Sequence, residues 1–147
     1  MQLGPLALLA ALAAAPAQAC TIGVSTPGIL ALSGDGHTLS SANSGGIASI
    51  LAISDLSLLG STTITISDTR LDVTPPGFAA PVSYGATYSA DWLLGVGHAS
   101  GSLAGSPSFT VPAVLNLVVT LTLHNTVTSA TGFRQGNYTT KTTVTCS

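Results

Sequence analysis

The chain has 147 residues, only 5% of them charged, and a formal net charge of −2. Its cations are Arg70, Arg134 and Lys141, too few to build the basic stripe that neutralises several phosphates. This balance argues against nucleic acid and anionic membrane surfaces as partners. Ser and Thr supply about a quarter of the positions, so we expect a hydroxyl-rich, nearly neutral surface.

The first segment, residues 1–19, has the pattern of a cleavable secretion signal. An apolar run over residues 6–15 ends at Pro16, and small residues precede the cleavage expected after Ala19. The run is too short to span a bilayer. We therefore expect residues 20–147 to form one exported domain without a transmembrane span, in the periplasm or at the cell surface of a bacterium.

The two cysteines stand at opposite ends of this expected mature chain. Cys20 would be its first residue, and Cys146 lies one residue from the end of the sequence. A lipid-anchored Cys20 is the alternative, but Ala17 and Gln18 fit the lipoprotein peptidase poorly, and lipidation would leave Cys146 as a lone thiol in an oxidising compartment. The sequence favours a Cys20–Cys146 disulfide.

The dominant hydrophobic period is two, which predicts many short strands and almost no helix. The clearest strand is 114–124, whose core face comprises Leu115, Leu117, Val119, Leu121 and Leu123. A second, 136–146, places Tyr138 and Cys146 on one side. Further strands are expected over 21–24, 29–32, 46–53 and 61–67, with short ones at 84–90 and 107–111.

Strands without crossover helices imply antiparallel pairing, and their apolar faces need a second layer to cover them. The predicted fold is all-β, an antiparallel two-sheet β-sandwich of immunoglobulin-like (pilin-like) type following the signal peptide. Pro and Gly interrupt residues 74–112 so often that most of this stretch is expected to be a loop region.

The last strand carries a family resemblance. Gly136-Asn137-Tyr138-Thr139, followed by Thr143-Val144-Thr145, resembles the terminal strand of the bacterial spore coat U and related pilin-like proteins, and Cys20-Thr21-Ile22 is similar to their first strand. The resemblance implies an immunoglobulin-like domain exported with a periplasmic chaperone, with an outer-membrane usher and copies of itself as partners. It implies polymerisation by exchange of a donated strand.

Four residues of the expected loop region are candidates for binding. Asp91 and Trp92 can form a sugar-binding platform, and Tyr84 and His98 lie in the same stretch. The alternative for Trp92 is a hydrophobic anchor at one end of the sandwich, and the alternative for His98 is a solvated loop position.

No catalytic, metal or cofactor site is predicted. No serine lies in a G-x-S-x-G elbow, and the three histidines lack short ligand spacing. His37, in Asp35-Gly36-His37, is expected in a turn, and His124 on the polar face of its strand. Asp68 and Asp72 bracket Arg70 and are expected to form a surface charge cluster rather than a calcium loop.

Three functions follow from these features. The first is an exported non-enzymatic structural protein of the cell surface, pilin-like or coat-like, with a role in attachment. The second is a soluble periplasmic binding module that uses residues 74–112 as its recognition surface. The third, a small secreted hydrolase, has no motif to support it.

Overall fold

The computed structural model describes residues 20–56, 60–93, 96–113 and 117–147. The expected signal segment and part of the strand predicted over 114–124 lie outside these residues. Within them the fold is all-β, and every strand pair is antiparallel. No helix in the described ranges is long and apolar enough to cross a membrane.

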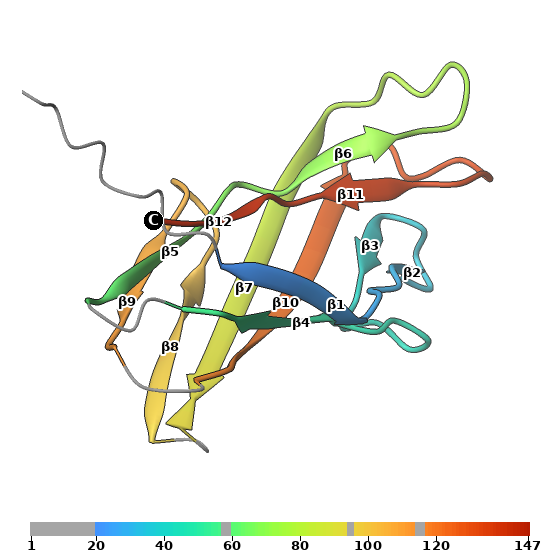
Figure 1. Ribbon diagram of the computed structural model, residues 1–147. Helices are drawn as coiled ribbons and strands as arrows, with labels where there is room; N and C mark the ends of the chain where they lie inside the picture. Colours follow the sequence, from blue (N-terminus) through green and yellow to red (C-terminus); the bar gives the residue numbers. More distant parts are fainter. Residues whose placement is uncertain (1–19, 57–59, 94–95, 114–116) are drawn as a thin grey trace, which may run out of the picture.

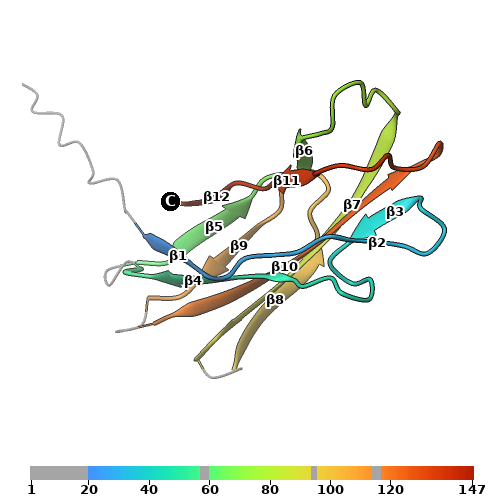
Figure 2. The same ribbon diagram turned by 90° about the vertical axis from the view of Figure 1, so that its right-hand side faces the viewer.

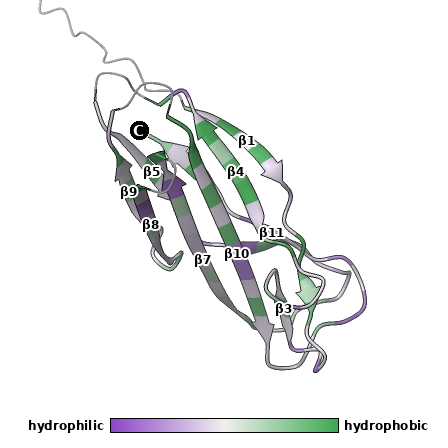
Figure 3. Ribbon diagram, turned by 90° about the horizontal axis from the view of Figure 1, so that it is seen from below, coloured by the Kyte–Doolittle hydropathy of each residue, from purple (hydrophilic) through white to green (hydrophobic). Residues whose placement is uncertain are grey.

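The larger sheet is organised around β10 (Val119–Ser129), whose residues alternate between buried and accessible positions. Along one edge β10 pairs with β4 (Ser49–Ser54) and then with β3 (Thr38–Ser40). Along the other it pairs with β7 (Val82–Trp92), which pairs in turn with β8 (Gly97–Ser102). β1 (Thr21–Thr26) and β2 (Ala31–Leu32) are the outer strands next to β4 and β3. Figure 3 shows the alternating hydropathy along β10.

The second layer consists of two small sheets. β5 (Thr62–Ile66) lies between β9 (Ser108–Val111) and β12 (Val144–Cys146). β6 (Arg70–Val73) pairs with β11 (Thr139–Lys141). Because β5 leads into β6 and β11 into β12, the two sheets continue one another along the layer (Figures 1 and 2).

The core lies between the layers and takes side chains from both. Ile53 and Leu121 of the larger sheet and Ile64 of β5 are completely buried. Tyr88 and Trp92 both stack on Phe109, with ring centroids 5.8 Å apart in each pair. The layered arrangement is sandwich-like, as the apolar inward faces require.

A disulfide joins Cys20 to Cys146 across a sequence separation of 126, which confirms the predicted pairing. Cys20 directly precedes β1, and Cys146 ends β12, so the bond ties the edge of one layer to the edge of the other. Both half-cystines pack against the core.

Two expectations about the strands need correction. The strand predicted over 136–146 is divided into β11 and β12. Between them the Ser67 amide still donates to the Thr143 carbonyl, but the Thr143 amide donates to the side-chain oxygen of Ser67 instead of to a backbone carbonyl. The expected loop region 74–112 is mostly strand, since it holds β7, β8 and β9. Small and hydroxyl residues weakened the alternation in β7 and β8, yet Ala86, Tyr88 and Ala90 keep the inward positions.

Candidate functional site

One edge of the larger sheet has its inward face uncovered. Ile22 lies opposite Ile53 in the β1–β4 pair, yet Ile22 is 37% exposed and Ile53 is 0% exposed. Val24, on the same face of β1, is 66% exposed, and Leu32 of β2 is 48% exposed. These positions face the side that the second layer covers elsewhere, so the layer ends before it reaches β1 and β2.

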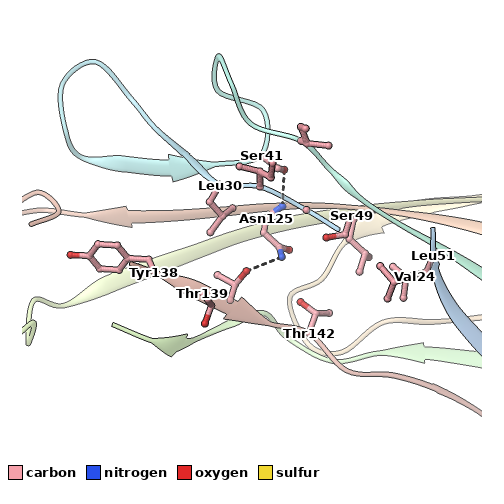
Figure 4. Close-up of a pocket in the computed structure, with 14 residues that line it drawn as sticks. Val24, Leu30, Ser41, Ser49, Leu51, Asn125, Tyr138, Thr139 and Thr142 are labelled. Atoms are coloured by element: carbon pink, nitrogen blue, oxygen red, sulfur yellow. Dashed lines mark hydrogen bonds between the residues drawn. The ribbon is translucent and has the colours of Figure 1, made fainter. Parts of the chain in front are cut away.

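A groove opens between this edge and the second layer. Its volume is about 370 Å³, within the range of binding sites for small molecules or short segments. On one side it is lined by apolar residues of the uncovered edge and of β4, and on the other by Tyr138 and the hydroxyl residues of β11 and its flank (Figure 4). The apolar lining comprises Val24, Ile29, Leu30, Ile47 and Leu51, with the Ser49 hydroxyl of β4 on the same side. The hydroxyl lining of the other side comprises Thr139, Thr140 and Thr142.

The backbone around the groove is shaped by Pro27-Gly28, where the sequence predicted a break. After β1 the chain turns away and returns to pair through an isolated bridge between Ile29 and Ile47. Gly28 lies so close to Ser49 that a Cβ at this position would meet the Ser49 hydroxyl at 2.2 Å. Glycine at position 28 therefore permits the close approach that forms this wall of the groove.

Asn125 connects the two layers at the floor of the groove. It occupies an inward position of β10 and is 9% exposed. Its side-chain carbonyl accepts a hydrogen bond from Thr69 at 3.0 Å, and its amide donates to Thr140 at 3.2 Å. The Thr69 hydroxyl is also 2.7 Å from that of Thr142. These bonds satisfy a polar side chain that would otherwise be costly to bury.

The groove can hold an uncharged, partly apolar occupant. None of its lining residues carries a formal charge at neutral pH. His124, on the strand that carries Asn125, is exposed on the outer face, with Nδ1 3.4 Å from the Ser41 hydroxyl. A chain that enters beside β1 would meet apolar side chains on one side and hydroxyls on the other. Among the strands of the described residues, β1 pairs with β4 alone.

The structure does not bring the four predicted binding residues together. Trp92 points inward and is stacked on Phe109, as the anchor interpretation expects, so that face of its ring is not open to a sugar. Gly97 is required beside it, since a Cβ there would meet Trp92 Nε1 at 1.9 Å. Tyr84, eight residues before Trp92, is 44% exposed, and its hydroxyl accepts a hydrogen bond from the Leu71 amide.

Asp91 and His98 form a separate pair on the outer face. His98 lies in β8, not in the expected loop, and its Nδ1 is 2.8 Å from the Asp91 carboxylate across the β7–β8 ladder. Both side chains are about half exposed, at 49% for Asp91 and 52% for His98. An exposed pair of this kind contributes little to stability.

The remaining predicted charged and histidine positions lie apart from the groove. Asp35-Gly36-His37 forms the expected turn, with Gly36 at φ 75° and the His37 amide donating to the Asp35 carboxylate. Asp68, Arg70 and Asp72 line a shallow surface hollow together with Lys141. Among the described residues, no group of three His, Cys, Asp or Glu side chains is placed to hold a metal ion.

The groove was missed because its residues are far apart in sequence. The predicted strand stopped at His124, one residue before Asn125, so the polar side chain on the core face of β10 was not noticed. Continuing the alternation from Leu121 and Leu123 would have placed Asn125 inward, and a buried amide indicates a polar partner nearby.

Comparison of the chain with protein-family models, with curated proteins and with solved structures found no match.

Proposed function

We propose that this chain is an exported, non-enzymatic structural protein of the bacterial cell surface, pilin-like or coat-like, which assembles through the open edge beside β1. The observation that carries the proposal is the exposure of Ile22, Val24 and Leu32 on the inward side of the sheet. In this proposal the fold is an immunoglobulin-like sandwich of the type that the resemblance to spore coat U proteins implies.

The physical argument rests on the edge itself. An edge strand offers unpaired backbone donors and acceptors, and proteins usually protect such edges with charge, Pro or a covering segment. β1 and β2 contain no charged residue, so their edges lack the charge that usually protects an edge strand. An added strand would gain backbone hydrogen bonds along β1 and cover the apolar wall of the groove.

The occupant we propose is an extended segment of a second copy or of an export partner such as a chaperone. The uncharged lining suits a segment with small apolar and hydroxyl side chains, which this sequence has in abundance. With few charges on the chain, electrostatic repulsion between copies is also weak.

The test is the native size of the mature chain and of two matched variants. Val24→Lys places a charge in the groove, whereas Val118→Lys places one on the outer face, where Val118 is 49% exposed. We expect the unmodified chain and Val118→Lys to form multimers that survive mild denaturant, and Val24→Lys to remain monomeric. A chain that is monomeric at all concentrations, alone and after co-expression with the export machinery, would contradict assembly.

The groove volume favours one alternative, a soluble periplasmic binding module. Its recognition surface would then be the groove rather than residues 74–112, because that stretch is mostly strand. A monomer that binds an uncharged small molecule, and loses this binding in Val24→Lys, would support the alternative.

A further inference from the structure

The outer face of the β12-β5-β9 sheet is covered by hydroxyl side chains. Ile64 and Ile66 of β5 point into the core with 0% exposure, so the alternate residues of β5 point outward. The same alternation holds for β9 and β12. We call this the hydroxyl face; it consists of Thr63, Thr65, Ser67, Ser108, Thr110, Thr143, Thr145 and Ser147.

The strand register arranges these side chains in rows. Thr65 lies between Thr145 on β12 and Ser108 on β9. Thr63 lies opposite Thr110 and exchanges backbone hydrogen bonds with Ser147. Rows of this kind repeat at about 4.8 Å across the strands and about 6.6 Å along them, so the backbone sets a regular array of hydroxyls.

The Ser67 hydroxyl accepts a hydrogen bond from the Thr143 amide. The other side-chain hydroxyls of this face have no hydrogen-bond partner among the described residues. Hydroxyls without a hydrogen-bond partner among the described residues also occur on the outer face of the larger sheet, at Thr120, Thr122 and Thr128 of β10. That face is mixed, however, since Ser40 bonds to Thr126 and Asp91 pairs with His98. The hydroxyl face therefore differs in being uniform: its hydroxyls, apart from that of Ser67, are free to bond outward and are not mixed with histidines or an ion pair, as they are on the other face.

Strand propensity alone does not account for this composition. Thr is favoured in strands, but Ser is not among the residues enriched there. None of these eight residues is charged or aromatic, since Phe109 of β9 points to the core side, where it stacks on Trp92. Charged side chains border the face at one end, where Ser67 and Thr143 adjoin the hollow of Asp68, Arg70, Asp72 and Lys141, two acids and two bases. The hydroxyl face is therefore suited neither to an anionic polymer nor to stacking on single sugar rings.

We propose that the hydroxyl face binds an uncharged polysaccharide that lies along the strands and exchanges hydrogen bonds with the rows of Thr and Ser. A polysaccharide presents hydroxyl donors and acceptors at a regular repeat, as this face does. The Thr side chains are β-branched and stand on a paired backbone, so they have little rotamer freedom to lose on binding. Many weak hydrogen bonds can therefore together stabilise the complex at a small cost in side-chain entropy. This inference concerns a different surface from the groove and does not rest on the proposed assembly.

The test uses affinity electrophoresis of the mature, disulfide-bonded chain through gels containing hydroxyethyl cellulose or a soluble β-1,3-glucan, with alginate as the anionic comparison. Thr63→Val/Thr65→Val/Thr110→Val removes three hydroxyls and preserves shape and strand propensity. The matched control, Thr120→Val/Thr122→Val/Thr128→Val, makes the same change on the outer face of β10. Thermal unfolding confirms that both variants fold.

We expect a neutral glucan to retard the unmodified chain and the control, and alginate to retard neither. The hydroxyl-face variant should bind the glucan about tenfold more weakly or worse, since each lost hydrogen bond contributes on the order of 1 kcal/mol. Equal retardation of both variants, or no retardation of the unmodified chain by either glucan, would overturn the proposal. Inhibition of ice growth without binding to a glucan would also overturn the proposal, because the hydroxyl face would then recognise ice rather than a polysaccharide. Multimer formation is scored separately, so failure here leaves the proposed assembly intact.

Discussion

The inward face of the larger sheet is packed in its centre and uncovered at its edge. Along β10, Val119, Leu121 and Val127 are completely buried, whereas Val24 on β1 is mostly exposed and Leu32 on β2 is about half exposed. All five residues are aliphatic and face the same side. The difference arises only from where the second layer ends, so an aliphatic residue in an alternating strand does not by itself indicate a buried position.

The two regions are held in place by different forces. The centre is stabilised by burial of apolar surface between the layers. The edge relies on backbone pairing with β4 and on the covalent bond from Cys20 to Cys146. The predictions below test this division of roles.

Removing the disulfide should have the largest effect. We expect Cys20→Ser/Cys146→Ser to lower the free energy of unfolding by a few kcal/mol, up to about 5, because the bond closes a loop of more than a hundred residues. Denaturant titration without reductant measures the loss. A change below about 1 kcal/mol would mean that pairing alone secures the edge.

A matched pair of substitutions compares centre and edge directly, because Ile22 and Ile53 are cross-strand neighbours. Ile53→Ala should cost about 3 to 4 kcal/mol, since it leaves a cavity among completely buried side chains. Ile22→Ala should cost about 1 kcal/mol. If urea titrations show that Ile22→Ala and Ile53→Ala lower the free energy of unfolding by similar amounts, Ile22 must be covered in solution. The assembly proposal expects that result for multimers but not for monomers.

The polar floor of the groove, where the centre meets the open edge, should show an intermediate effect. Asn125→Ala leaves the Thr69 and Thr140 hydroxyls without this partner and should cost about 2 kcal/mol. Thr128→Ala, on the outward face of the same strand, should cost less than about 0.5 kcal/mol. If Thr128→Ala lowers the thermal unfolding temperature more than Asn125→Ala does, the hydrogen bonds of Asn125 do not stabilise the contact between the two layers.

The smallest effect concerns the turn between β2 and β3, at the far end of the uncovered edge. Hydrogen bonds from the Ser33 hydroxyl and then from the His37 amide lower the pKa of Asp35 from its usual 3.8. A lowered pKa stabilises the fold above the unfolded-state pKa, and this contribution is lost as pH falls below about 4. Asp35→Asn should therefore slightly reduce the fall in the free energy of unfolding between about pH 5 and pH 3, measured by denaturant titration. An unchanged pH dependence would contradict the stabilising role of the Asp35 carboxylate.

Local patterns predicted many of the elements correctly because period-two alternation reports which residues share a face. The strands β4, β5 and β9 and the buried face of β10 follow the expected positions, and the disulfide joins the expected cysteines. The alternation failed for β8, Gly97–Ser102, where glycines and small residues carry no hydrophobic signal. Gly97 is there to accommodate Trp92, a contact between strands that no local pattern records.

The candidate site was the least predictable part. Asp91, Trp92 and His98 are close in sequence, but adjacent residues in a strand point to opposite faces, so Trp92 is buried and the Asp91–His98 pair is exposed. The groove instead joins β1, β4, β10 and β11, which are distant in sequence.

The sequence by itself determined that this is an all-β chain of low charge with its first and last strands linked, because hydrophobic period, composition and cysteine position are local properties. Only the tertiary structure decided which inward faces are covered. Coverage depends on how far one layer extends over the other, and that is set by pairings between strands such as β5 and β12, about eighty residues apart in the chain.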